Sequence, residues 1–211
     1  MSKKNKAVGI GNAIVDAVCK VEENFLKLHN LQKGTMKLIN ETELKELQNE
    51  IKPSEFIAGG SVANSMVGLS SFGNSVYFFG KLNNDLFGKK YFESLKKENV
   101  GFDFDTKVHK DSTGICFVFI TPDGERTMNT HLGIANKLSE KEINHREIEQ
   151  SELILIEGYL WDTPKAKNAI IKSIEIASKN SIPISLSLSD VFCVERYKNE
   201  FLDLAKNKID M

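Results

Sequence analysis

Two adjacent glycines, Gly59 and Gly60, stand directly before an apolar-periodic segment and constrain the fold more than any other feature of the chain. A glycine has no Cβ atom, so it can adopt a positive φ and leave its N–H group open to a hydroxyl or an anion beside a helix N-terminus. Asn64 would then lie one turn into the helix, with a donor and an acceptor to offer. The stretch predicts a small-molecule site. The alternative interpretation is a tight loop whose glycines only allow close packing.

The composition is that of a globular protein with a sizeable core. The 211 residues suffice for one large domain or two small ones, and 41% of them are hydrophobic. The formal net charge of -1 provides no bulk basic field that would recruit nucleic acid. No apolar run approaches the roughly 18 residues that a membrane span needs, and no apolar signal region follows the basic start. We therefore expect a cytoplasmic protein with neither nucleic acid nor membrane as a partner.

The three cysteines, Cys19, Cys116 and Cys193, are far apart and form no C-x-x-C pair. Their apolar neighbours indicate reduced core residues, so we expect neither a disulfide framework nor a metal site.

The pattern of apolar residues predicts strands that alternate with helices, which is typical of an α/β fold with a parallel sheet. Helices are predicted to begin near Asn40, Gly60, Asp85 and Pro164, with another after the last buried strand. The Pro122-Asp123-Gly124 turn predicts a hairpin. Predicted strands cover residues 7–10, 15–21, 75–79, 113–120, 126–131, 153–156 and 184–188, and residues 208–211 resemble the start of a further strand.

Gly9-Ile10-Gly11 resembles the opening of a dinucleotide-binding fingerprint. However, Ile14 occupies the third glycine position, and the residues after it alternate like a strand instead of opening a helix. A nicotinamide-dependent oxidoreductase is therefore disfavoured.

Asn12 and Asp16 follow the first predicted strand. A carboxylate, a carboxamide and open backbone amides are together the groups that grip vicinal hydroxyls. Spacing alone favours a plainer interpretation, in which Asp16 is an exposed residue on the face of an amphipathic strand.

Residues 58–65, with Gly73 and Gly80 downstream, resemble the first signature of the ribokinase-type (PfkB) carbohydrate kinase family. Residues 80–88 are similar to the family segment G-x-x-G-x-D-x-F-G, although Asn83 replaces its second glycine, and residues 112–114 and 124–127 also look like family segments. Residues 186–192 are similar to the L-S-x-x-F stretch of the adenosine kinase branch and depart from the D-P-N pattern of fructokinase-like members. The resemblance begins near Ala7 and covers about the N-terminal two thirds of such a kinase.

The resemblance implies a three-layer α/β/α sandwich with a small β-sheet lid over the acceptor sugar. Residues 12–21, 34–39 and 104–120 are the candidate lid segments, and residues 1–211 would form one incomplete kinase domain. The implied activity is an ATP-dependent sugar or nucleoside kinase of the adenosine kinase-like branch. ATP and Mg²⁺ are the implied cofactors of a complete member, and a sugar or nucleoside is the implied partner.

Specific site residues also follow from the resemblance. Asn12 and Asp16 would bind sugar hydroxyls, and Gly59, Gly60 and Asn64 would line the same site. Glu157 occupies a position that faces the acceptor in ribokinase-like members, whereas adenosine kinases have other residues there.

The family's catalytic element has no match in these 211 residues. Members transfer the γ-phosphoryl of ATP at a C-terminal G-A-G-D segment, whose amides form an anion hole and whose Asp is the general base. Phosphoryl transfer depends on positioning and charge stabilisation. We therefore expect an N-terminal portion of a kinase with no catalytic residue and no tight ATP binding, inactive by itself.

The alternative is a non-catalytic module that binds a sugar or nucleoside. The sequence leaves open which acceptor is used and which oligomeric state is adopted, although an exposed lid sheet is suited to a homodimer.

Overall fold

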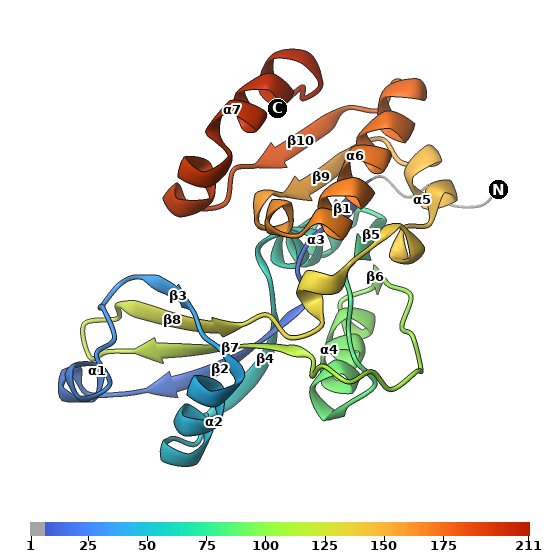
Figure 1. Ribbon diagram of the computed structural model, residues 1–211. Helices are drawn as coiled ribbons and strands as arrows, with labels where there is room; N and C mark the ends of the chain where they lie inside the picture. Colours follow the sequence, from blue (N-terminus) through green and yellow to red (C-terminus); the bar gives the residue numbers. More distant parts are fainter. Residues whose placement is uncertain (1–6) are drawn as a thin grey trace.

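The computed structural model describes residues 7–211, which form two five-stranded sheets in separate lobes (Figure 1). The first sheet has the order β10-β9-β1-β5-β6, and all of its strands are parallel. Its strands are β1 (Ala7–Ile10), β5 (Val76–Phe79), β6 (Val100–Gly101), β9 (Ile154–Glu157) and β10 (Ile184–Ser187). This confirms the predicted α/β fold with a parallel sheet.

The second sheet is mixed and has the order β3-β8-β7-β2-β4. Its strands are β2 (Ile14–Lys20), β3 (Met36–Leu38), β4 (Glu55–Gly59), β7 (Gly114–Ile120) and β8 (Arg126–His131). The three candidate lid segments contribute β2, β3 and β7 to this sheet. It also includes β4 and β8, which those segments do not contain.

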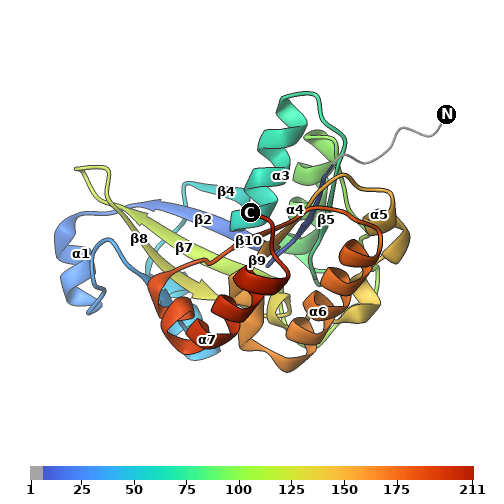
Figure 2. The ribbon, with the colours of Figure 1, turned by 90° about the horizontal axis from the view of Figure 1, so that it is seen from above.

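Helices cover both faces of the first sheet, as a parallel sheet requires. On one face, Ala7 and Phe78 pack against α3 (Ser61–Ser71) and α4 (Leu86–Lys97). On the other face, Val8 and Ile10 pack against α6 (Pro164–Lys179), with α5 (His145–Glu149) and α7 (Val191–Asn207) contributing to the same cluster. Figure 2 shows α3 and α6 on opposite sides of this sheet.

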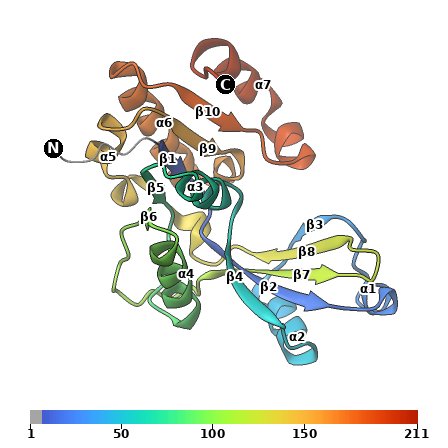
Figure 3. The ribbon, with the colours of Figure 1, turned by 180° about the vertical axis from the view of Figure 1, so that it is seen from behind.

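Only one face of the second sheet is covered by helices. Ala17 and Cys19 point to this face and pack against α1 (Glu23–Leu28) and α2 (Glu41–Glu50). Figure 3 shows α1 at the far end of the sheet and α2 beside it. Because side chains alternate along a strand, Asp16 points to the opposite face. That face carries the site described below.

Several local predictions are confirmed by hydrogen bonds. Asn40 and Glu43 form both halves of a capping box at α2. Gly124 has a φ of 84° in the turn of the β7–β8 hairpin. Ser139 and Glu142 form a second capping box, at the short 3-10 helix Glu140–Glu142.

Residues at the end of the described chain contact β10. The backbone amides of Asp210 and Met211 donate to the carbonyl of Ile184, and the amide of Leu186 donates to the carbonyl of Met211. These bonds begin to pair the free edge of β10 where the sequence predicts a further strand, although no strand is formed there.

The three cysteines are buried and lie outside any disulfide of the described residues, which confirms that they are core residues. Within residues 7–211, no helix is both long enough and apolar enough to span a membrane.

Candidate functional site

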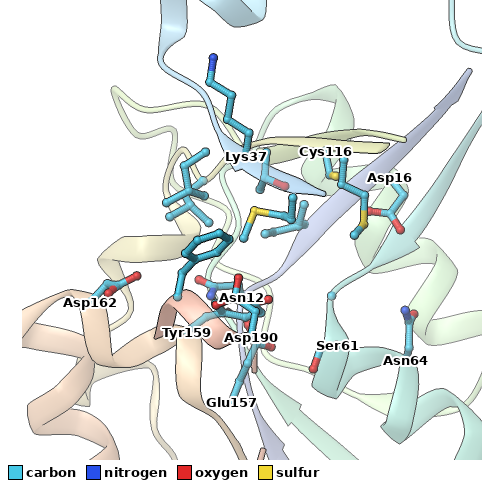
Figure 4. Close-up of a pocket in the computed structure, with 18 of the residues that line it drawn as sticks. Asn12, Asp16, Lys37, Ser61, Asn64, Cys116, Glu157, Tyr159, Asp162 and Asp190 are labelled. Atoms are coloured by element: carbon cyan, nitrogen blue, oxygen red, sulfur yellow. Dashed lines mark hydrogen bonds between the residues drawn. The ribbon is translucent and has the colours of Figure 1, made fainter. Parts of the chain in front are cut away.

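A cavity of about 540 Å³ lies between the open face of the second sheet and the carboxyl ends of β1 and β9 (Figure 4). Such carboxyl ends are where ligands bind in open α/β sheets. The lobe of the first sheet contributes Asn12, Gly60, Ser61, Asn64 and Glu157, and the strands of the second sheet contribute Asp16 and Cys116. Segments that are far apart in the sequence therefore meet at one cavity.

Asn12 and Glu157 form the floor of this cavity. The Asn12 Nδ2 atom donates to Glu157 Oε1 at 3.0 Å, and each residue is only 2% exposed. Among the described residues, neither Asn12 Oδ1 nor Glu157 Oε2 has a hydrogen-bond partner. Buried polar atoms are normally paired, so these two oxygens are available to the donors of a ligand.

Burial raises the pKa of Glu157 to about 7, above its ordinary value of 4.5. The Asn12 side chain and the backbone amides of Val62 and Asn12 act in the opposite direction. The cost of desolvating the charge is the larger effect. Glu157 is therefore partly protonated near neutral pH, and it can accept or donate a hydrogen bond.

Asp16 stands on β2, paired with Cys116 of β7 on one side and Ile57 of β4 on the other. Burial raises the pKa of Asp16 to about 6, and the positive charge of Arg126 acts in the opposite direction. Asp16 lines the cavity and is largely enclosed, whereas the plainer interpretation expects an exposed residue on the face of the strand. Its carboxylate is charged above about pH 6 and can accept hydroxyl donors there.

Gly59 lies behind Asp16 and does not line the cavity. A Cβ atom at position 59 would lie 2.5 Å from Cγ of Asp16, so only a glycine leaves room for the carboxylate. The Tyr91 hydroxyl donates to the Gly59 carbonyl at 2.8 Å and fixes this backbone from the side of α4. Gly59 therefore supports the site indirectly.

Gly60 has a φ of 100° and precedes the first residue of α3, as the glycine pair predicts. A Cβ atom at Gly60 would lie 2.4 Å from the backbone oxygen of Asn12, so close packing and an open helix start occur at the same residue. Asn64 lies one turn into α3, and its exposed side chain borders the cavity beside Ser61 (Figure 4).

The candidate lid segments 12–21 and 34–39 supply Ile14, Met36 and Leu38 to an apolar wall of the cavity, whereas the part of this wall that comes from β8 was not predicted from the sequence. Of the apolar lining residues, Ile14, Met36, Leu38, Met128 and Leu132 come from the lobe of the second sheet, and Tyr159 and Phe192 come from the lobe of the first. The period-two alternation of Arg126, Met128 and Thr130 along β8 is a signal that could have identified part of this wall.

Charged residues at the rim of the cavity are mostly engaged with one another. Arg196 donates from Nε and Nη2 to Asp162, at 3.0 and 2.9 Å. Asp190 caps α7 by accepting from the Cys193 amide at 2.7 Å. Lys37 extends away from the cavity (Figure 4), and its Nζ contacts Glu43 at 2.8 Å. These groups hold the walls together.

The segment 80–88 connects the two lobes. The Asp85 carboxylate accepts from the Gly88 amide at the start of α4, and from both the amide and the hydroxyl of Thr113 just before β7. Asn83, which replaces a family glycine, does not adopt a positive φ, so no glycine is required there. Its side chain bonds the backbone of His109 as donor and acceptor.

Within the described range, no group of three or more His, Cys, Asp or Glu side chains is arranged to hold a metal ion. We therefore derive no step through Mg²⁺ from these residues.

The pattern of the pfkB family carbohydrate kinases matches residues 5–209. Guanosine-inosine kinase of Escherichia coli (strain K12) is 27% identical over 197 residues, which are 89% of this chain and 45% of that protein. A 5-dehydro-2-deoxygluconokinase of Clostridium botulinum (strain Eklund 17B / Type B) is 31% identical over 148 residues, 67% of this chain and 42% of that protein.

Solved structures resemble the fold closely. Adenosine kinase from Sinorhizobium meliloti superposes with a TM-score of 0.92 at 35% identity, covering 98% of this chain and 64% of that one. A probable sugar kinase from Rhizobium etli CFN 42 superposes with a TM-score of 0.92 at 32% identity, covering 99% of this chain and 63% of that one. The chain thus spans less than half the length of these curated relatives and less than two thirds of these structures.

Proposed function

Because the chain belongs to the pfkB family of carbohydrate kinases and has their ribokinase-like α/β fold, we propose that its cavity binds the phosphate acceptor of a nucleoside kinase. The whole protein would transfer a phosphoryl group from ATP, with Mg²⁺, to a hydroxyl of that acceptor. The observation that carries the proposal is the two-sided lining of the cavity, a polar floor beneath an apolar wall.

The polar floor suits the ribose part of a nucleoside. In the proposal, the Asp16 carboxylate and the two unpaired oxygens of Asn12 and Glu157 accept from hydroxyls. Asn64 and the open start of α3 at Gly60 border the same space and supply donors. These residues bind and orient the acceptor, and none of them is assigned the role of general base.

The apolar wall suits a nucleobase. Met36 and Met128 are direct neighbours on β3 and β8, and methionine sulfur makes favourable contacts with aromatic rings. Phe192 and Tyr159 add aromatic surface. A free sugar would leave this wall in contact with water, and each buried Å² of apolar surface is worth roughly 25 cal/mol. This favours a nucleoside over a free sugar.

Charge disfavours an anionic acceptor such as a sugar acid. Asp16 and Glu157 present carboxyl groups to the cavity, and of the three described cations that line it, Arg196 and Lys37 are engaged with Asp162 and Glu43, so that only the exposed Arg126 is unpaired. Bringing the carboxylate of a ligand close to these two groups would cost free energy through like-charge repulsion. Of the activities named for the relatives, those of guanosine-inosine kinase and adenosine kinase therefore fit better than a gluconate kinase activity.

A calorimetric titration of the full-length protein tests the proposal. We expect adenosine, inosine or guanosine to bind at least tenfold more tightly than ribose or gluconate. Asp16→Asn should weaken nucleoside binding by roughly tenfold or more, because a hydrogen bond to a charged group is worth about 1.5 to 3 kcal/mol. Asp203→Asn, the same change on the exposed side of α7, is the control. Equal affinity for ribose, or unchanged affinity in Asp16→Asn, would contradict the proposal.

A non-catalytic module that binds a sugar or nucleoside is the second candidate, because the polar and apolar lining of the cavity would serve binding alone equally well. Both candidates predict nucleoside binding, and only the kinase predicts acceptor-dependent release of ADP by the full-length protein. The cytoplasmic location and a homodimer through the second sheet remain predictions. Native mass spectrometry would test the homodimer.

A further inference from the structure

Asn129 lies in the middle of β8, on the face of the strand that points away from the cavity. Its neighbours in the chain, Met128 and Thr130, line the cavity, and successive side chains of a strand point to opposite faces. The register of the second sheet places Asn129 beside Phe117 of β7, which is in turn beside Ala17 of β2. Phe117 and Ala17 both belong to the apolar core that packs against α1 and α2. Asn129 therefore carries a carboxamide into this core.

The Asn129 carboxamide is buried without a hydrogen bond to the protein. The residue is only 1% exposed, and among the described residues neither its Oδ1 nor its Nδ2 atom has a partner. Buried polar side chains are normally satisfied by protein groups or by ordered water. A cation would satisfy only the oxygen of this amide, and an anion only its N–H groups. Water can both donate and accept, so it is the ligand that matches both unpaired atoms.

Polar side chains flank Asn129 on the same face of β8. Thr127 and His131 are two positions before and after it, which places them about 7 Å away along the strand, a span that one bridging water can cover. The Thr127 hydroxyl accepts from the Gly34 amide at 3.0 Å and keeps its own proton to donate. His131 Nδ1 lies 3.3 Å from the Ile39 carbonyl oxygen, so in the neutral ring Nδ1 carries the proton and Nε2 is an acceptor. The buried amide thus has a donor on one side and an acceptor on the other.

We propose that this face of β8 binds internal water at Asn129, with Thr127 and His131 as its further ligands. A buried water typically makes about three hydrogen bonds to polar groups that would otherwise be unsatisfied, and these three side chains supply them. Water held in this way allows the strand that carries Met128 and Thr130 to the cavity to keep a polar residue in its covered face. The site lies on the other side of the sheet from the cavity, so the inference is independent of the proposed function.

A high-resolution crystal structure of the full-length protein is the first test. We expect an ordered water within about 3.2 Å of the Asn129 carboxamide and within the same distance of Thr127 Oγ1 or His131 Nε2. In Asn129→Leu this water should be absent, while β8 keeps its register with β7. A wild-type carboxamide that has no ordered water, or that bonds only to protein atoms, overturns the inference.

Urea denaturation of Asn129→Leu is the second test. If the amide is hydrated, leucine removes its bonds with water and leaves Thr127 and His131 facing an apolar side chain, so the folding equilibrium constant should fall by roughly fivefold or more. If the amide is dry, leucine replaces an unsatisfied polar group, and the variant should be more stable than the wild type.

Asn49→Leu makes the same change at an exposed position of α2, and as the control it should alter the constant by no more than about twofold. An Asn129→Leu variant that is as stable as the wild type, or more stable, overturns the inference. If this variant does not fold, the crystal structure of the wild type decides alone.

Discussion

Adjacent glycines at the start of α3 meet different requirements. A side chain at Gly59 would collide with the carboxylate of Asp16, which is a group proposed to bind ligand. A side chain at Gly60 would collide with the backbone of Asn12, and the φ of 100° at Gly60 is itself strained for any other residue. Position 60 therefore affects the geometry of the site through the main chain, which cannot move aside as easily as a side chain.

Replacing Gly60 with valine should abolish nucleoside binding and destabilise the protein, while most of the fold is retained. A β-branched residue neither adopts a positive φ readily nor fits against the Asn12 oxygen. Gly68→Ala in the same helix is the control, because a Cβ atom there meets nothing within 4 Å and should stabilise α3 by up to about 1 kcal/mol. Circular dichroism and calorimetry measure the two effects, and intact binding in Gly60→Val would show that the glycine is needed only for packing.

Glu157 should make the stability of the protein depend on pH. Burial raises its pKa from 4.5 to about 7, so the folded state holds the proton more tightly than the unfolded state does. Stability contributed by this group is therefore present at acidic pH and is lost as the pH rises through about 7, and Asp16 acts in the same direction. Glu157→Gln removes the titrating group.

Relative to wild type, the free energy of unfolding of Glu157→Gln should increase between pH 5 and pH 8, by up to about 3 kcal/mol. Urea denaturation at the two pH values measures this difference. Glu195→Gln on α7 is exposed and should show no such trend. A difference between Glu157→Gln and wild type that does not change with pH would show that Glu157 titrates normally.

At the scale of elements, the connection between the lobes depends on one carboxylate. Asp85 caps α4 through the Gly88 amide and bonds Thr113 twice at the start of β7, each bond being 2.8 Å long. Because β7 carries Cys116 beside Asp16, this connection also determines where the second sheet stands over the cavity. The family segment 80–88 is thus explained by its structural role.

Asp85→Ala should lower the free energy of unfolding by roughly 2 to 4 kcal/mol, since it removes a helix cap and two further charge-assisted bonds. Asp85→Asn should lower the free energy of unfolding by less, because its amide oxygen can still accept from the Gly88 amide and from the Thr113 hydroxyl. Chemical denaturation of the three proteins tests this order. Equal stability of Asp85→Ala and wild type would mean that the connection adds nothing.

Elements with local signals could be predicted from the sequence, and elements made by distant pairing could not. The Asn40 capping box and the turn at Gly124 use residues a few positions apart, so their patterns are visible in the chain. β4 has no such signal, because its exposed residues form a strand only through pairing with β2, about 40 positions earlier. The two-residue β6 and the short helices α1 and α5 also have no local pattern that predicts them.

The same difference between local and distant contacts separates the predicted residues of the candidate site from the unpredicted ones. Asn12, Asp16, Gly60, Asn64 and Glu157 meet at one cavity, and the family motifs and strand ends in the sequence pointed to them. The candidate lid segment 34–39 also supplies β3 to the apolar lining, but the contributions of β8 and the start of α7 were not predicted, because their approach depends on how the two sheets are oriented. Nothing in the local pattern of residues encodes that orientation.

At the scale of the whole molecule, the cavity lies between two lobes and draws residues from position 12 to position 196. We expect the purified polypeptide of residues 1–211 to bind a nucleoside without phosphorylating it. Losing a general base typically costs 10²- to 10⁴-fold in rate, and these residues contain neither the G-A-G-D base nor its anion hole. A coupled ADP-release assay measures this, and acceptor-dependent turnover above a no-enzyme control would contradict it.

The central claim is that the two-sided cavity holds a nucleoside, with its ribose on the polar floor. A crystal structure of the full-length protein with bound adenosine tests this claim most directly. We predict ribose hydroxyls within hydrogen-bond distance of the Asp16 carboxylate and the base packed against Met36 and Met128. A nucleoside bound outside this cavity, or bound in it with the base on the Asn12 and Glu157 floor, would contradict the account.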